Sequence, residues 1–534
     1  MQPSRIPYAS TGKFSGLIKD FLDQKEPIRS FFGNMPSLLG FENQLALKSG
    51  FEQVRRDVLI ESLKKQYTHL NLQGDEAADI VKRINLLQQK NTFTVTTGHQ
   101  LCLFTGPLYT VYKIVHTIKL AEELAAKFPQ HNFVPIFWMA TEDHDFEEVN
   151  HIHLNGHKIV WHATPGDAVG RMSTAGISKA IDELAFRLLE GDRTAGLLDD
   201  LRDAYEKHKN LADATRALVH KWFGQRGLLI VDGDDAELKK AMIPAFKREL
   251  LENLSFHAVE ETNQKLAENF KIQVTPREIN LFYLRDGMRT RIVETDGRFS
   301  ALNTDFSWNE NEILAELDNH PERFSPNVLL RPLYQETILP NLAYIGGGGE
   351  VAYWAEMKDM FDAFDVPFPI VMLRQSMQFE PKRLARKRQK LQLSFEELFQ
   401  EYHIVANELI KRNCDYEAEL APQREKLIAA FAAIKTLATS TDKTLEKTVE
   451  AQKTQMLNKL MQLEKKMIRA AKRKDNDGLR MLQEWQNEMM PGGGLQERHD
   501  NILQHLVSFG DDFWSSLFKN VEPLNFEFLV LTEE

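Results

Sequence analysis

The chain has 534 residues, with 66 Lys and Arg against 77 Asp and Glu, so its formal net charge is −11. This length predicts about two to four domains, and a composition of 43% hydrophobic and 27% charged residues excludes a disordered chain. The acidic balance argues against nucleic acid as a partner.

The first 90 residues are predicted to be helical, because their apolar residues recur at three- and four-residue spacing. A β-branched strand follows at residues 92–98 and ends in a glycine turn. A long helix at 107–128 and a nearly continuous apolar strand at 133–143 complete a βαβ unit. Strands that are apolar throughout predict a parallel sheet that is covered on both faces.

The middle of the chain repeats this pattern and interrupts it. Residues 227–254 predict a strand, a turn and a helix, whereas 281–302 predict hairpin strands that turn at Asp286-Gly287 and Asp296-Gly297. Residues 328–374 predict a strand beginning at Val328, a glycine turn, a helix and a last strand. The fold class is therefore α/β, with antiparallel segments inserted between the strands of the core.

Residues 381–490 are rich in Lys, Glu, Gln, Leu and Ala and predict helices. A coiled-coil seam about two heptads long is formed by Met456, Leu460, Leu463, Met467 and Ala470. An antiparallel hairpin and a two-chain coil fit this seam equally well. We predict a core at 1–380 with inserted segments at about 150–225 and 255–325, an α-helical coiled-coil domain at 381–495, and a segment at 496–534 that returns to the core.

The small number of cysteines and the lack of long apolar segments indicate where in the cell the protein is expected. Cys102 and Cys414 are too few for a disulfide framework or a four-cysteine zinc site, which favours a reducing, cytoplasmic environment. The N-terminus has no apolar signal region, and the longest apolar run, 133–140, is too short to span a bilayer. We therefore expect no membrane association.

The loop between the first strand and its helix, 96–107, is the first candidate site. It offers Gly98, His99 and Gln100 at the carboxyl end of a strand, where open α/β sheets bind ligands. Thr105 and Gly106 precede a helix N-terminus that could cradle an anion. An ordinary loop with Thr105 as a cap is the alternative. Cys102 lies in an apolar context and is interpreted as buried filling.

The acidic loop after the second strand, 140–153, is the second candidate. It holds five carboxylates, including Glu142, Asp143 and Asp145, together with His144, His151 and His153. Crowded carboxylates have raised pKa values unless a basic group lies among them, and His144 or a carboxylate could act as a general base. His with Asp or Glu could bind Mg²⁺ or Zn²⁺, but the spacing does not match H-E-x-x-H, so the metal signal is weak and we assign no metal ligands. A solvated loop that caps a helix is the alternative.

The glycine turn at 346–349 is the third candidate. Its glycines allow the backbone to approach a ligand, and Glu350 in the following helix could bind a substrate amine. Predicted binding residues around it are Arg331, Tyr334, Gly347, Gly348, Gly349, Glu350, Tyr353, Trp354 and Arg374. A flexible turn with an aromatic core contact, and an Arg331 that pairs structurally with an acid, are the alternatives. Basic runs at 382–390 and 465–474 are interpreted as solvated helix faces, although the first could reach a nucleotide phosphate.

Four blocks of sequence, 96–124, 134–154, 331–358 and 366–374, resemble the BshC family of bacillithiol biosynthesis, and the similarity covers nearly the whole chain. The resemblance implies a Rossmann-like parallel-sheet core with inserted connecting segments, and a C-terminal coiled-coil domain that forms a homodimer. It also implies a ligase that adds L-cysteine to the amine of glucosaminyl-malate in the last step of that pathway. A nucleotide, ATP or ADP, would activate the cysteine carboxylate.

These motifs and the resemblance together give a mechanistic hypothesis. The turn at 98–107, including Gln100, Thr105 and Gly106, would hold a phosphate or carboxylate. Asp143, His144 or Asp145 would take the amine proton, and His99 would donate to a phosphate or carboxylate. Glu350 would orient an amine or sugar hydroxyls, with Glu142 beside the substrate, and Arg331 would pair with malate.

Two other classes of function remain open. One is a metal-dependent amide hydrolase or deacetylase of a sugar, built on Asp143, His144, Asp145 and His153; the other is a non-catalytic nucleotide-binding scaffold that uses its coiled coil. The ligase hypothesis itself requires the segments ending at residues 98, 142 and 346 to surround one cavity.

Overall fold

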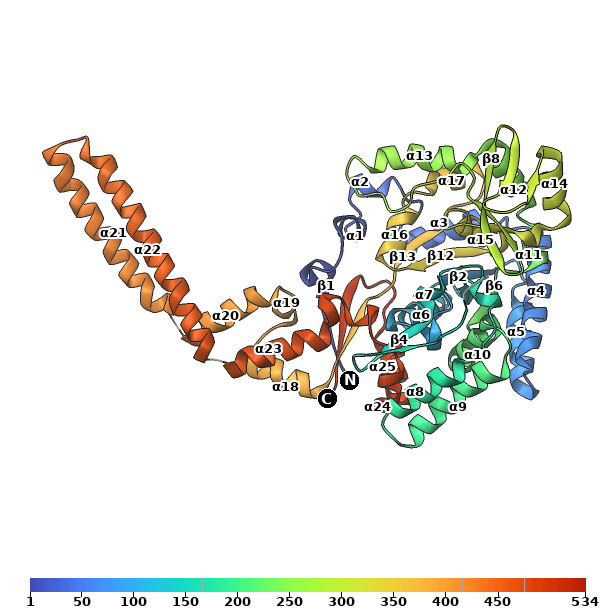
Figure 1. Cartoon of the computed structure of the whole chain (residues 1–534), viewed down its shortest axis with the longest axis horizontal. Helices are drawn as coiled ribbons and strands as arrows, with labels where there is room; N and C mark the ends of the chain where they lie inside the picture. The colour runs from blue at the N-terminus through green and yellow to red at the C-terminus, as the bar shows by residue number, and fades with distance from the viewer. Residues whose placement is uncertain (165–167, 415, 475) are drawn as a thin grey trace. The chain divides into compact units, whose positions relative to one another are not determined.

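A computed structural model describes residues 1–164, 168–414, 416–474 and 476–534 (Figure 1). The predictions for Cys414 and for Lys472, Arg473 and Lys474 concern side chains outside the described set. The chain divides into two compact units. The smaller comprises Met1–Gly12, Gln378–Gln496 and Val530–Glu534, and the larger comprises Lys13–Met377 and Glu497–Leu529.

The larger unit is built on a five-stranded sheet in which every neighbouring pair is parallel. Its strands, in the order β13-β12-β2-β3-β6, are β13 (Ile370–Leu373), β12 (Asn341–Gly346), β2 (Thr92–His99), β3 (Asn132–Met139) and β6 (Leu229–Asp232). The first strand along the chain is thus central, and the order reverses between β2 and β12. That is the strand order of a Rossmann fold, and it creates a ligand crevice at this reversal. The predicted α/β, Rossmann-like fold class is confirmed.

A hydrophobic layer explains why these strands form a buried sheet. Phe93 and Val95 of β2 alternate onto one face, where they meet Leu120 and Leu124 of α6 (Leu108–Lys127). Phe41 and Leu45 of α3 (Leu38–Lys48) belong to the same cluster. The helix α6, which connects β2 to β3, therefore covers the sheet with its apolar face. This packing fixes the positions of the loops at both ends of the helix.

The inserted segments include two antiparallel elements. A hairpin of β4 (His151–Leu154) and β5 (His157–Val160) follows β3. A second five-stranded sheet has the order β10-β9-β8-β7-β11, with strands β10 (Ser307–Trp308), β9 (Arg298–Ala301), β8 (Met288–Thr295), β7 (Leu281–Arg285) and β11 (Phe324–Pro326). Both predicted Asp-Gly turns are confirmed: each falls between neighbouring strands, and Asp296 and Gly297 have φ values of 52° and 75°, as the tight hairpin turn requires.

Helices fill the rest of the larger unit. They include α1 (Gly16–Leu22), α4 (Gln53–Tyr67), α5 (Gly74–Leu86), α8 (Ile177–Arg187), α9 (Asp192–Lys207), α10 (Leu211–Phe223), α11 (Ala236–Lys240), α12 (Ile243–Glu252), α13 (Leu254–Leu266), α14 (Glu310–Asn319), α15 (Leu330–Ile338), α16 (Gly348–Trp354), α17 (Lys358–Ala363), α24 (Leu503–Phe509) and α25 (Asp511–Asn520). None of the described helices is both long and apolar enough to cross a membrane.

Two predictions of secondary structure were wrong. The strand expected at Val328 is the start of helix α15, because Leu330 and Leu333 continue a helical spacing, and the side chain of Asn327 accepts the free backbone N–H group of Leu329 at 2.9 Å. The first residues are not all helical either, since β1 (Gln2–Pro7) forms a strand. Its polar sequence carries little hydrophobic signal because it lies at the edge of its sheet.

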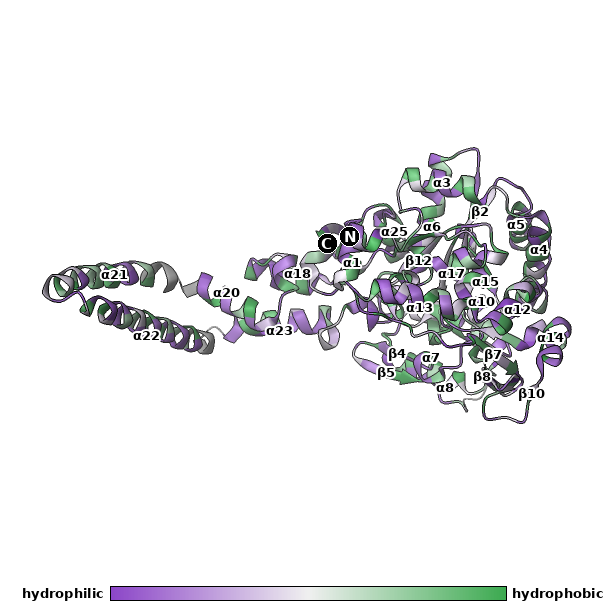
Figure 2. Cartoon of the chain, turned by 90° about the horizontal axis from the view of Figure 1, so that it is seen from above, coloured by the Kyte–Doolittle hydropathy of each residue, from purple (hydrophilic) through white to green (hydrophobic). Residues whose placement is uncertain are grey.

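The smaller unit combines a three-stranded sheet, in the order β1-β15-β14, with helices. The other two strands are β14 (Met377–Glu380) and β15 (Glu527–Thr532), and the main helices are α18 (Lys382–Leu391), α20 (Tyr402–Cys414), α21 (Tyr416–Thr441), α22 (Leu445–Lys474) and α23 (Asn476–Met489). The helices α21 and α22 lie side by side as an antiparallel hairpin (Figure 1), and hydrophobic and hydrophilic residues alternate along both (Figure 2). Of the two arrangements left open, the chain itself forms the hairpin.

Candidate active site

A cavity of about 720 Å³ lies at the carboxyl ends of three parallel strands in the larger unit. Gly98 and His99 line it at the end of β2, Glu142 and Asp143 just after β3, and the glycines 347–349 just after β12. The expectation that these three strand ends surround one cavity is confirmed. The cavity includes the reversal point between β2 and β12, where an open α/β sheet binds its ligands.

The inserted antiparallel sheet supplies a second wall. Phe282 of β7 and both Arg289 and Arg291 of β8 face the cavity. The two arginines are two residues apart, so the alternation of a strand places them on one face. Further lining comes from Val274, Thr275, Arg277, Ile279, Asn280, Leu281 and Arg498.

Positive charge dominates the lining. Seven cationic side chains contribute to it: Lys113, Arg277, Arg289, Arg291, Arg331, Arg374 and Arg498. Three carboxylates, Glu142, Asp143 and Glu350, oppose them. A cavity with such an excess of guanidinium groups favours ligands that carry carboxylates or phosphates.

Glu350 has a structural task at the glycine turn. Its carboxylate accepts hydrogen bonds from Tyr344 Oη at 2.6 Å and from the Gly347 backbone N–H group at 2.8 Å, and it forms an ion pair with Lys113. Lys113 in turn donates to the Gly98 carbonyl at 2.9 Å. Burial alone would raise the pKa of Glu350, but the charge of Lys113 and the hydrogen bonds from Lys113, Tyr344 and Gly347 together outweigh it and keep this pKa below the usual value. Because both oxygens already have partners, Glu350 ties β2 to β12 rather than offering a free carboxylate to an amine.

Arg331 of α15 differs, because part of its guanidinium is uncommitted. Its Nη1 atom donates to Gln335 at 3.1 Å, whereas Nη2 is buried and has no hydrogen-bond partner among the residues that the structure describes. The group lies 5.9 Å from the ring centre of Trp138 and 5.4 Å from that of Tyr344. A buried donor without a partner is costly, so a ligand anion at this place would be stabilised.

Arg374 is already paired with an acid. Its guanidinium donates to both carboxylate oxygens of Glu497, at 2.7 and 2.8 Å, and both side chains are buried. It still lines the cavity, and its guanidinium lies over the ring of Tyr109, 5.3 Å from the ring centre. Arg374 thus anchors the segment that begins at Glu497 beside the last strand of the sheet.

Of the four predicted site residues in the acidic loop, Glu142, Asp143 and His144 line the cavity and Asp145 does not. Asp143 accepts hydrogen bonds from Gln100 Nε2 and from the His144 backbone N–H group, both at 2.7 Å. His144 is exposed and lies with Nδ1 3.0 Å from Arg289. Asp145 instead caps the short helix α7 (Phe146–Val149) through Glu148 N at 3.2 Å and does not line the cavity. Its capping role matches the alternative interpretation of this loop.

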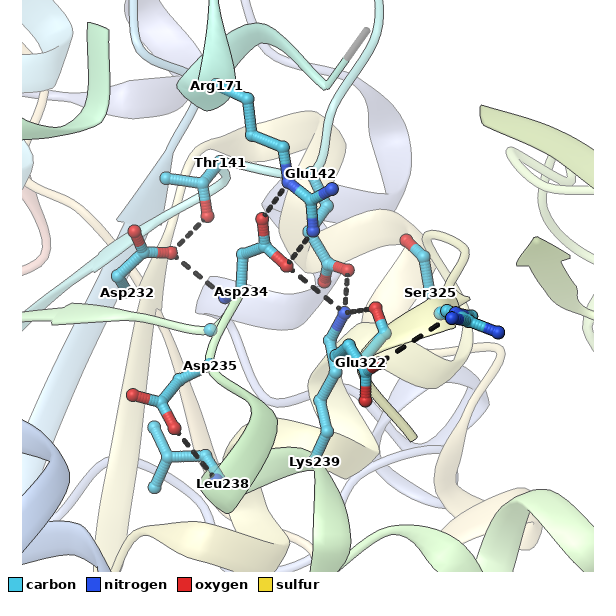
Figure 3. Close-up of polar contacts among 12 residues, drawn as sticks. Thr141, Glu142, Arg171, Asp232, Asp234, Asp235, Leu238, Lys239, Glu322 and Ser325 are labelled. Atoms are coloured by element: carbon cyan, nitrogen blue, oxygen red, sulfur yellow. Dashed lines mark hydrogen bonds and ion pairs between the residues drawn. The ribbon is translucent and has the colours of Figure 1, made fainter. Parts of the chain in front are cut away.

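A buried network of ion pairs and hydrogen bonds fixes the start of the acidic loop (Figure 3). Lys239 of α11, fully buried, pairs with Glu142 at 2.5 Å and with Asp234 at 3.3 Å. Asp234 accepts both arms of Arg171, at 2.6 and 2.8 Å. Burial, together with the nearby Asp234, raises the pKa of Asp232 to about 6. Lys239 is therefore the basic group that the crowded carboxylates require.

His99 and Cys102 form a neutral patch. Burial, followed by the charge of Lys113, lowers the pKa of His99 to about 3, so its ring is uncharged at neutral pH. It packs edge-on against Tyr109, with ring centres 5.1 Å apart. Burial raises the pKa of the Cys102 thiol to about 12, and the interpretation of this residue as buried filling is confirmed.

Besides Asp145, four predicted site residues do not line the cavity: Thr105, Gly106, Tyr334 and Trp354. The helix start after Gly106 is already satisfied, since Leu108 N donates to the Asp500 carbonyl at 2.8 Å. The Tyr334 hydroxyl donates to the Gly233 carbonyl at 2.9 Å, and Trp354 stacks on Tyr344 with ring centres 4.8 Å apart. These residues shape the core around the site; Tyr353, Gly347, Gly348 and Gly349 do reach the cavity.

The sequence did not identify six of the lining residues as site residues. They are Arg289 and Arg291 of β8, Tyr109 and Lys113 of α6, Arg277 and Arg498. Lys113 had a signal in the sequence, because it is the only Lys, Arg, Asp or Glu in the mostly apolar first part of the helix, 108–118, and shares a face with Tyr109 four residues earlier. Arg289 and Arg291 also had one, in their two-residue spacing within a strand. Arg498 had none, because it reaches the cavity from a distant part of the chain.

Among the described ranges, no group of three or more His, Cys, Asp or Glu side chains is arranged to hold a metal ion. Two histidines of the 140–153 loop have other contacts: His151 and His153 form a ring contact with each other, and His153 stacks on His499.

Sequence models of known families match almost the whole chain. The "Bacillithiol biosynthesis BshC, N-terminal Rossmann-like domain" matches residues 1–375, and the "Bacillithiol biosynthesis BshC, C-terminal coiled-coil domain" matches residues 377–533. The chain belongs to the BshC family. A relative from Flavobacterium johnsoniae named "Putative cysteine ligase BshC" is 43% identical, with 99% of each chain covered. Relatives of the same name from Christiangramia forsetii and Flavobacterium psychrophilum are each 42% identical, over 100% and 98% of this chain and 99% and 98% of theirs.

This membership confirms the resemblance inferred from the sequence blocks. The prediction that the chain is an enzyme of the ligase class, acting in bacillithiol biosynthesis, is also confirmed. The comparisons give no support to a sugar amide hydrolase or to a non-catalytic scaffold.

Proposed function

We propose that this BshC protein joins the carboxyl group of L-cysteine to the amine of glucosaminyl-malate and so forms bacillithiol in the cytoplasm. The observation that carries the proposal is the arginine-rich cavity at the sheet reversal, which also holds the carboxylate of Asp143. The substrate pair fits both features, since malate and cysteine bring carboxylates and the sugar brings an amine that must lose a proton. The names of the relatives support the use of cysteine.

The arginines would bind the anionic end of the sugar substrate. Arg331 offers a buried N–H group without a partner, and Arg291 and Arg277 line the same cavity. Carboxylates bound by guanidinium groups gain charge-assisted hydrogen bonds of about 1.5–3 kcal/mol each. Malate would therefore lie toward α15 and β8, with the amine toward Asp143.

Amide formation from a free carboxylate is uphill in water, so the cysteine carboxyl group needs activation, and ATP is the proposed co-substrate. The glycine turn leaves space for a bulky anion: a Cβ atom added at Gly349 would meet no atom within 4 Å, and Arg331 lies on the same cavity. In the joining step, the amine nitrogen attacks the activated carboxyl carbon and forms the C–N bond. The C–O bond to the phosphate-containing leaving group breaks and that group takes the electron pair, while Asp143 accepts the amine proton.

The test is reconstitution with the purified chain, cysteine, glucosaminyl-malate and ATP, with bacillithiol measured by mass spectrometry. We expect product that depends on all three substrates and falls about 100-fold or more in Asp143→Asn. Arg298→Ala, which alters an exposed arginine outside the cavity, is the matched control and should retain activity. Absence of product would contradict the proposed reaction, and product without nucleotide would remove the activation step.

We further propose that the helical hairpin of α21 and α22 forms a homodimer. Leu437, Met456 and Leu463 on these helices are 71%, 42% and 50% exposed, so apolar surface is left for a second chain. Light scattering should give about twice the chain mass of 61.5 kDa, and Leu437→Glu with Leu463→Glu should give the monomer. A monomeric wild-type chain would contradict this proposal.

A further inference from the structure

Arg289 is held at each of its three guanidinium nitrogens. Its Nε atom donates to Ser325 Oγ at 3.1 Å, Nη2 donates to the Pro326 carbonyl at 3.2 Å, and Nη1 lies 3.0 Å from His144 Nδ1. The group also stacks over the ring of Phe282, 3.9 Å from its centre. It therefore has a fixed orientation, with one N–H bond directed at the imidazole.

This contact determines where the proton of His144 is. A guanidinium can only donate hydrogen bonds and remains charged in proteins, so Nδ1 must contribute a lone pair. A neutral imidazole carries one N–H group, which must then be on Nε2. Burial lowers the pKa of Arg289, and the charges of Glu142, Asp143 and Asp234 oppose this shift and favour the charged form.

A competing contact favours the other tautomer but is weaker. Asp143 Oδ1 lies 3.7 Å from His144 Nδ1, beyond hydrogen-bonding distance, and this oxygen already accepts the His144 backbone N–H group at 2.7 Å. Arg289, at 3.0 Å, is the closer partner. The distances therefore favour a proton on Nε2.

We propose that Arg289 is a positioning residue that holds His144 in its Nε2–H tautomer, so that His144 acts as a hydrogen-bond donor and not as the general base. Within the proposed ligation, on which this inference rests, the Nε2–H group would donate to the oxygen that gains charge when the amine attacks. Asp143, which accepts hydrogen bonds from Gln100 and lines the same cavity, is then the proton acceptor.

The tautomer can be measured without any substrate. In the full chain labelled with ¹⁵N-histidine, the ring nitrogens of His144 are assigned by their disappearance in His144→Gln. At pH 8 we expect a protonated Nε2 and an unprotonated Nδ1, and a mixture of tautomers in Arg289→Ala. Arg298→Ala, on the neighbouring strand of the same sheet, should leave the signals unchanged. A wild-type proton on Nδ1 would overturn the proposal.

Activity provides the second arm of the test. Glutamine offers an amide N–H donor and a carbonyl acceptor but cannot act as a base, so His144→Gln should retain turnover within about tenfold. His144→Ala, which lacks the donor, should lose about 100-fold or more. Equal loss in both variants would show that His144 is needed as a base. If no variant and no wild-type sample forms product, the proposed reaction fails, whereas the tautomer measurement still decides the role of Arg289.

Discussion

The buried ion pair of Arg374 and Glu497 gives the sharpest stability prediction. Both side chains are at most 3% exposed, and the two hydrogen bonds between them measure 2.7 and 2.8 Å. Glu497 Oε2 also accepts the Met377 backbone N–H group at 3.0 Å. Glu497→Gln keeps the shape of the side chain but leaves the Arg374 charge buried without a counter-charge, which costs about 3–5 kcal/mol.

The assay is urea unfolding of the full chain, monitored by tryptophan fluorescence. An ion pair on the surface is the control. Lys240 and Glu237 lie at the same separation, 2.8 Å, but are 56% and 57% exposed. Glu237→Gln should therefore cost at most about 1 kcal/mol. If Glu497→Gln destabilises the chain no more than Glu237→Gln does, the reasoning about the buried pair is refuted.

Three further predictions follow from the site. Arg331→Met should raise the KM for glucosaminyl-malate about 10–100-fold in steady-state kinetics, because a charge-assisted bond is lost, and an unchanged KM would place malate elsewhere. Burial raises the pKa of Asp232 to about 6 in the folded chain, so the free energy of unfolding of the chain falls as the pH rises from about 4 through 6. Asp232→Asn removes this titration, and in urea unfolding it should gain up to about 3 kcal/mol over wild type between pH 4 and pH 8. A constant difference would contradict this. Because burial keeps Cys102 protonated, Cys102→Ala should turn over within about twofold of wild type, and a large loss would give the thiol a chemical role.

The parallel core could be predicted because its signals are local. The strand at 92–99 is rich in β-branched residues and is buried at every position but the last, and the helix at 108–127 has a regular apolar face, so each segment indicates its own structure. The short helix α15 was predicted as a strand because its apolar residues lie close together in the sequence. Its first turn also has no acidic residue that would indicate a helix start; Asn327 caps the N-terminus instead. The polar edge strand β1 forms only because a neighbouring strand pairs with it.

The candidate site could be predicted only where it follows strand ends. Rossmann topology brings residues 98, 142 and 347 together, so their shared cavity follows from the fold. Ion-pair partners that come from distant parts of the chain cannot be predicted from the spacing of residues in the sequence. Glu497 neutralises Arg374 and Lys113 neutralises Glu350 through contacts that depend on tertiary packing, and each contact changes the task of the residue that the sequence singled out.

We place the ligation in the cavity between the ends of β2, β3 and β12 and the arginines of β8. A crystal structure of the chain soaked with glucosaminyl-malate tests it most directly. We expect the sugar in this cavity, with a malate carboxylate within hydrogen-bonding distance of Arg331 and the amine near Asp143. Density for the sugar at another place, with this cavity filled by solvent alone, would contradict it.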